Sequence, residues 1–98
     1  MADGELPNVL LIVLDAARAD HFSCYGYERK TTPNIDKLAS EGLRFSRAVS
    51  TSSWTLPSHA SMFTGLLPEE HGTTAQYNWL IDRIPTLAEL MRVKGYRT

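Results

Sequence analysis

A threonine, a proline and a histidine stand close together in the middle of this sequence. Residues 55–59 read Thr-Leu-Pro-Ser-His. Pro57 suits the first position of a helix, because its missing N–H is not needed there and its φ is already helical. Thr55 would then lie just before the first turn, where backbone N–H groups and the helix dipole favour an anion. A hydroxyl in that place could attack a phosphate or sulfate ester, although the same residue types also form ordinary helix caps and turns.

A second candidate lies near the N-terminus, directly after an apolar run. Residues 8–14 read Asn-Val-Leu-Leu-Ile-Val-Leu. This pattern predicts a strand that is buried on both faces, as in a parallel sheet covered by helices. Asp15 follows it, and the carboxyl ends of such strands are where open α/β sheets bind ligands. Asp15 is therefore a candidate binding residue, and it is equally suited to cap the turn that follows.

Local signals predict the elements that would position these two residues. Thr-Pro at the start and glycine at the end predict a helix over residues 32–42. Alternation of apolar and polar residues predicts a half-buried strand over 43–49. Further helices are expected over 57–65 and over 86–95, the second opening with a Thr-x-x-Glu capping box. This order predicts an α/β layered fold with a mostly parallel sheet, apparently truncated where a further strand is expected.

Composition limits the other possibilities. The chain has 98 residues and a net charge of −1, so we expect at most one domain and no nucleic-acid partner. Cys24 is the single cysteine, so neither an internal disulfide nor a cysteine-rich metal site is possible. Residues 1–7 form a polar leader without the features of a secretory signal. The apolar run 9–14 is too short to span a bilayer, which predicts no membrane contact and a cytoplasmic location.

Four further polar residues lie near these elements: Arg18, Asp20, His21 and His71. Arg18 and Asp20 are expected to form a local surface pair. His21 could bind a metal, but histidine has many other roles. His71 falls in an expected loop over residues 66–72, where histidines are usually polar surface residues.

Several short motifs occur in one order along the chain. The motifs are Asp15 after the apolar run, Cys24-Tyr25-Gly26, Thr32 to Asp36, Gly42 to Phe45, Thr55 to His59, Thr64-Gly65 and His71-Gly72. Together they resemble the N-terminal portion of sulfatases, in the alkaline-phosphatase-like superfamily. The resemblance covers residues 8–98, which would be the N-terminal part of a sulfatase-like domain.

The resemblance implies a metal-dependent hydrolase. By its motifs, Asp15 matches a metal-ligating aspartate, and Thr55 matches the nucleophile, which also touches the metal. The implied cofactor is a divalent ion: calcium, zinc, magnesium or manganese. Such an ion would help to deprotonate the hydroxyl and would neutralise charge on the ester oxygens.

Three residues depart from the sulfatase pattern. Sulfatases typically begin this signature with a cysteine or serine that is oxidised to formylglycine, and the extra methyl group of Thr55 blocks that conversion. His59 replaces a frequent arginine, and Ala16 replaces a frequent second aspartate. Phosphoesterases and phosphotransferases of the superfamily use threonine as the nucleophile. The substrate is therefore expected to be a small phosphate or sulfate ester, with phosphate esters favoured. His59 would bind the anionic oxygens or protonate the leaving group.

Length suggests an alternative to catalysis. Sulfatases are several times longer than this chain, and their other metal ligands lie further downstream, so the isolated chain is expected to be inactive. The alternative is a non-catalytic small α/β protein that acts by binding or by self-association through exposed sheet edges.

Overall fold

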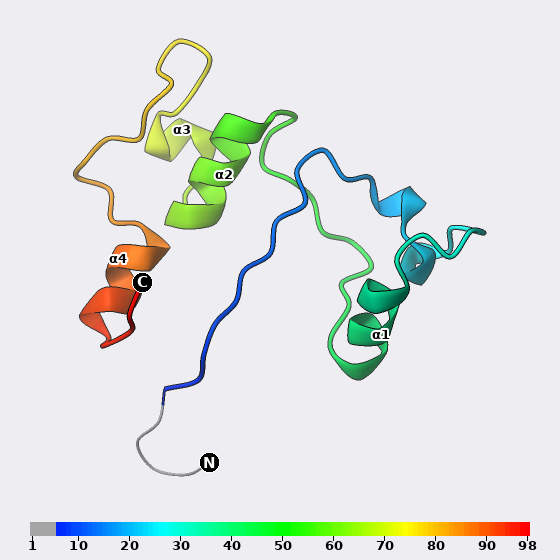
Figure 1. Ribbon diagram of the computed structural model, residues 1–98. Coiled ribbons are helices and arrows are strands. Elements are labelled where there is room, and N and C mark those ends of the chain that lie inside the picture. Colours follow the sequence, from blue (N-terminus) through cyan, green and yellow to red (C-terminus); the bar gives the residue numbers. More distant parts are fainter. Residues whose placement is uncertain (1–5) are drawn as a thin grey trace. The chain divides into compact units, whose positions relative to one another are not determined.

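The structure is a computed structural model that describes residues 6–98 (Figure 1). Residues 1–5 of the predicted polar leader lie outside the described part. The described chain forms two compact units, residues 6–12 with 50–98 and Val13–Val49. In chain order, the helices are η1 (Ala19–His21), η2 (Ser23–Tyr25), α1 (Pro33–Glu41), α2 (Thr55–Thr64), α3 (Pro68–His71) and α4 (Leu87–Val93).

The predicted α/β fold is wrong for the described residues. Residues 8–14 and 43–49 have the composition of strands, but neither is a strand, and residues 6–98 contain no sheet. A strand is stable only when a neighbouring strand satisfies its N–H and C=O groups. Neither segment has such a neighbour, so strand-like composition has not produced a strand. Self-association stays a prediction, now without the sheet edges on which it was based.

The unit Val13–Val49 is organised around the start of α1. The predicted helix signals are confirmed there, with Thr32 at the N-cap position and Pro33 in the first turn. Ser23 Oγ of η2 donates to Asp36 Oδ2 at 2.6 Å, and Thr32 Oγ1 donates to Asp36 Oδ1 at 3.0 Å. These bonds lower the pKa of the Asp36 carboxyl below its usual range, with the Ser23 hydroxyl as the largest cause. One carboxylate thus fastens η2 to the first turn of α1.

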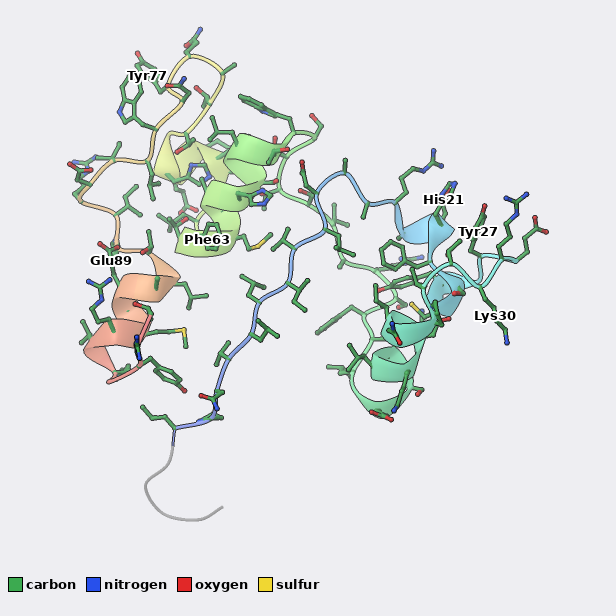
Figure 2. All side chains as sticks on the ribbon, viewed as in Figure 1. His21, Tyr27, Lys30, Phe63, Tyr77 and Glu89 are labelled. Carbon is green, nitrogen blue, oxygen red and sulfur yellow. The ribbon has the colours of Figure 1, made fainter. Side chains whose placement is uncertain are left out.

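The other unit contains α2, α3 and α4, with α2 packed against both of the others. Gly65, with φ of 72°, ends α2. The capping box that begins α4 is confirmed: Glu89 Oε2 accepts from the Thr86 N–H at 2.7 Å, and the Thr86 hydroxyl accepts from the Glu89 N–H at 3.4 Å. Figure 2 shows Glu89 beside the start of α4 and Phe63 on α2.

Burial in the described residues is unusual, because the most enclosed side chains are polar. No large hydrophobic side chain of residues 6–98 is buried, and the apolar run is exposed, with Leu10 at 82%. The buried side chains include Ser61, His71 and Thr73. Each helix in this part of the chain is too short or too polar to cross a membrane.

Candidate functional site

Thr55 is the first residue of α2, and its side chain is exposed. The helix therefore begins two residues earlier than expected, and Pro57 is its third residue. Proline is tolerated there because the first N–H groups of a helix have no intrahelical acceptor. Thr55 still lies at the end of the helix that carries positive potential. The predicted placement of a hydroxyl at a helix N-terminus holds, within the first turn and not before it.

His59 lies one turn after Thr55 on the same helix and is half-buried. Its Nδ1 atom lies 2.9 Å from the backbone carbonyl oxygen of Thr55, and the Ser58 hydroxyl donates to that same oxygen at 3.1 Å. The ring of His59 is also 6.2 Å from that of Phe63. The His59 ring is thus tied to the turn that carries Thr55.

Asp15 is exposed and occupies a tight turn directly after the apolar run. The turn closes with a hydrogen bond of 3.3 Å from the Ala17 N–H to the Leu14 carbonyl. Ala16 has φ of 55°, a left-handed conformation that is uncommon for alanine. Asp15 belongs to the unit Val13–Val49, so the pair of candidates that the structure itself brings together is Thr55 and His59.

The donors that could hold a metal are oxygen atoms. A carboxylate at Asp15 and a hydroxyl at Thr55 suit hard cations such as Ca²⁺ or Mg²⁺. No three or more His, Cys, Asp or Glu side chains of residues 6–98 gather into a metal-binding cluster. The donor types of Asp15 and Thr55 fit a hard divalent ion.

The surface pair between Arg18 and Asp20 is confirmed. Arg18 Nε and Nη2 donate to the two carboxylate oxygens at 3.0 and 2.6 Å, and His21 Nδ1 lies 3.0 Å from Asp20 Oδ1. These bonds hold the pKa of the Asp20 carboxyl well below its usual range, chiefly through Arg18. His21 is exposed, and its ring lies 4.9 Å from that of Tyr27 (Figure 2). The group is a local arrangement at the surface.

The prediction for His71 is wrong: this histidine is fully buried. It is the last residue of α3, a one-turn helix that was expected to be a loop. The sequence did contain signals for a helix here, because Pro68 stands at its start and glycine follows at 72. In the structure, Glu70 Oε2 accepts from the Leu67 N–H at 2.8 Å and caps that start. Ser61 and Thr73, which bond to the ring, carried no sequence signal of their own.

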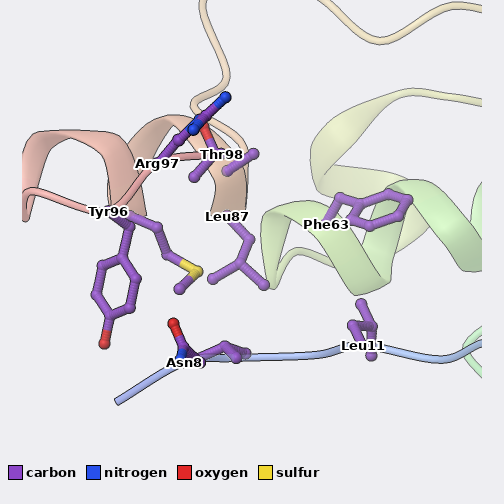
Figure 3. Close-up of a pocket in the computed structure, with 10 residues that line it drawn as sticks. Asn8, Leu11, Phe63, Leu87, Tyr96, Arg97 and Thr98 are labelled. Carbon is purple, nitrogen blue, oxygen red and sulfur yellow. The ribbon is translucent and has the colours of Figure 1, made fainter. Parts of the chain in front are cut away.

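Two pockets of about 360 Å³ each flank α2. One lies along the helix face that carries His59, and Trp79 and Leu80 also line it. The other, shown in Figure 3, lies between the segment with Asn8 and Leu11, Phe63 of α2, and Leu87 and the C-terminal residues after α4. Phe63 lines both pockets, whereas Thr55 and His59 are not among the residues that line the pocket in Figure 3.

Comparisons with known proteins agree with the motifs. The family model for sulfatases matches residues 7–98. The chain is 36% identical to human arylsulfatase H over 94% of this chain and 18% of that protein. It is 34% identical to human arylsulfatase A, over 94% of this chain and 19% of that protein.

The chain is also similar to a bacterial sulfatase. An N-acetylgalactosamine-6-O-sulfatase of Bacteroides thetaiotaomicron is 34% identical over 98% of this chain and 20% of that protein. No solved structure matches the chain. The chain thus spans about one fifth of the length of these relatives, and the matched residues confirm the predicted resemblance: the chain belongs to the sulfatase family.

Proposed function

We propose that this chain is the nucleophile-bearing N-terminal part of a sulfatase-family ester hydrolase, and that Thr55 is the nucleophile. The observation that carries the proposal is that Thr55, an exposed residue, is the first residue of α2. At this end of a helix, the dipole and the outward N–H groups stabilise negative charge on an ester's oxygens. The sulfatase relatives support hydrolysis of an ester.

The residue at position 55 decides which ester is proposed. The Thr55 hydroxyl attacks the phosphorus or sulfur atom, a bond forms to Oγ, and the bond from that atom to the leaving alkoxide breaks. The hydroxyl proton passes to a base or solvent, and the leaving group takes up a proton. Water then cleaves the Thr55 ester and releases phosphate or sulfate. An unmodified threonine favours phosphate esters, with sulfate esters as the second class.

A divalent ion is proposed as the cofactor. Sulfatases generally use such an ion, calcium, and when bound it neutralises charge on the ester oxygens and eases ionisation of a hydroxyl. Asp15 and Thr55 would provide two oxygen ligands. Ca²⁺ takes about six to eight, so we propose that the others come from a longer protein and that the isolated chain does not turn over substrate.

The first test is the mass of the native gene product. A product several times heavier than this chain would be purified and assayed with 4-nitrophenyl phosphate and 4-nitrophenyl sulfate across calcium, magnesium, manganese and zinc. We expect metal-dependent release of 4-nitrophenol, faster from the phosphate ester. Metal-dependent turnover by the isolated chain would contradict the proposed need for further ligands.

One observation favours a second candidate function. All the large hydrophobic residues of the apolar run are exposed in the described structure, and such surfaces mark interaction sites. A native product with the mass of this chain, together with a stable dimer and no hydrolysis of either ester, would favour a binding role over catalysis.

A further inference from the structure

Three polar side chains are buried at the contact between α2 and α3. The exposed fractions are 0% for His71, 1% for Thr73 and 6% for Ser61. His71 Nε2 lies 3.0 Å from Ser61 Oγ, and His71 Nδ1 lies 3.0 Å from the backbone nitrogen of Thr73. The Thr73 hydroxyl donates in turn to the Trp79 carbonyl at 3.2 Å. Buried polar groups are costly unless they are bonded, and these form a connected chain.

The partners determine where the proton of His71 sits. A backbone N–H only donates, so Nδ1 of His71 must accept the bond from Thr73. A neutral imidazole has one N–H, which is then on Nε2, and His71 donates it to the Ser61 hydroxyl oxygen. The bond from His71 to Ser61 therefore joins α3 to α2 in one defined tautomer.

The backbone after His71 is shaped for this arrangement. Gly72 has φ of 71°, and this left-handed turn brings the next N–H back toward the ring of the residue before it. A side chain at position 72 would be strained by that φ, although a Cβ there would be in ordinary contact with Ile81 Cδ1 at 3.8 Å. The turn, the ring and the serine thus form one structural unit.

We propose that His71 is a positioning residue that fixes the orientation of α2, and with it Thr55, through Ser61. Ser61 lies less than two turns from Thr55 on that helix. His71 is fully buried, so it acts through α2 and does not touch substrate. The part of this inference that concerns Thr55 rests on the proposed function, whereas the tautomer and the link to α2 do not.

The tautomer is measured in the unsubstituted protein, and a variant serves only to assign the signal. The full natural protein is labelled with ¹⁵N at histidine, and long-range ¹H–¹⁵N spectra at pH 7 report which ring nitrogen carries the proton. His71 is assigned by the signal that disappears in His71→Gln. The expected result is a neutral ring with the proton on Nε2. A proton on Nδ1, or a doubly protonated ring, would overturn the inference.

Substitutions test the link to the reaction. Ser61→Ala removes the acceptor, and we expect kcat for the phosphate ester to fall roughly tenfold with little change in KM, because a displaced nucleophile reacts slowly. Thr64→Ala is the control, since the Thr64 hydroxyl donates to the Ala60 carbonyl at 2.7 Å and accepts from the Leu66 N–H at 3.3 Å, and neither partner belongs to α3. His71→Gln, which keeps a donor near the Nε2 position, should retain more kcat than His71→Ala.

The outcomes separate the two proposals. Equal kcat in Ser61→Ala and Thr64→Ala, in a protein that is active, would overturn the positioning role. Absence of esterase activity in the parent protein would overturn the proposed function, while the ring spectrum would still decide between the Nε2–H and Nδ1–H forms of His71.

Discussion

The Nδ1 atom of His59 lies 2.9 Å from the backbone carbonyl oxygen of Thr55. A carbonyl only accepts hydrogen bonds, so Nδ1 carries a proton and donates it. In the neutral ring Nε2 then has a lone pair, and in the imidazolium it has a second N–H. His59 can therefore donate to an ester oxygen or to a leaving group only in its charged form.

This geometry gives a prediction that distinguishes the two proposed roles of His59. In the full natural protein, His59→Asn keeps a donor near the Thr55 carbonyl but removes Nε2, and we expect kcat/KM to fall by roughly a hundredfold if the ring is a general acid. The loss should be larger for an alkyl phosphate, whose leaving group needs a proton, than for 4-nitrophenyl phosphate. An equal loss for both substrates would favour binding of the anionic oxygens, and no loss for either would exclude both roles.

The left-handed conformation of Ala16 predicts a gain in stability on substitution. Ala16→Gly removes the clash of Cβ at φ of 55°, so we expect the free energy of unfolding to rise by up to about 1 kcal/mol. Ala17→Gly is the matched control and should lower the free energy of unfolding or leave it unchanged. Urea unfolding of the natural protein measures both, and a destabilised Ala16→Gly would contradict the strained turn beside Asp15.

The network around Asp36 predicts a dependence on pH. The folded-state pKa of this carboxyl lies below its unfolded value, chiefly because the Ser23 hydroxyl donates to it. The ionised carboxylate therefore stabilises the unit Val13–Val49 above the unfolded pKa of about 3.9, and this contribution is lost as the pH falls through the lower folded value.

The measurement is an NMR titration of the Asp36 carboxyl carbon. Ser23→Ala should raise the pKa of Asp36 toward the unfolded value and weaken the acid dependence of stability. Ser40→Ala should leave it unchanged, because the Ser40 hydroxyl bonds to the Lys37 carbonyl at 2.7 Å and not to Asp36. A pKa that does not respond to Ser23→Ala would contradict this account.

The helices were predictable from the sequence where their signals are local. Pro33 at the start of α1 and the Thr86–Glu89 capping box at the start of α4 act within one turn. Strands were not predictable in the same way, because the apolar run 8–14 needs a distant partner that residues 6–98 do not supply. The burial of His71 was missed for a related reason, since it depends on packing against Ser61, ten residues away.

The residues of the candidate site were likewise predictable from local sequence only in part. Thr55 and His59 are four residues apart on one helix, so their contact follows from helical spacing once α2 is predicted. The role of Asp15 came from the resemblance to sulfatases, and its proposed metal ligation needs residues beyond local sequence.

The central claim, that the Thr55 hydroxyl is the nucleophile, is tested most directly by trapping its ester. The full natural protein is mixed briefly with 4-nitrophenyl phosphate and a divalent ion, quenched with acid and mapped by peptide mass spectrometry, alongside Thr55→Ala and Thr55→Ser. We predict a phosphoryl group on residue 55 in the parent and in Thr55→Ser. In Thr55→Ala we predict no adduct and a loss of turnover of roughly a thousandfold or more. Turnover that persists in Thr55→Ala, or an adduct on another residue, would contradict the claim.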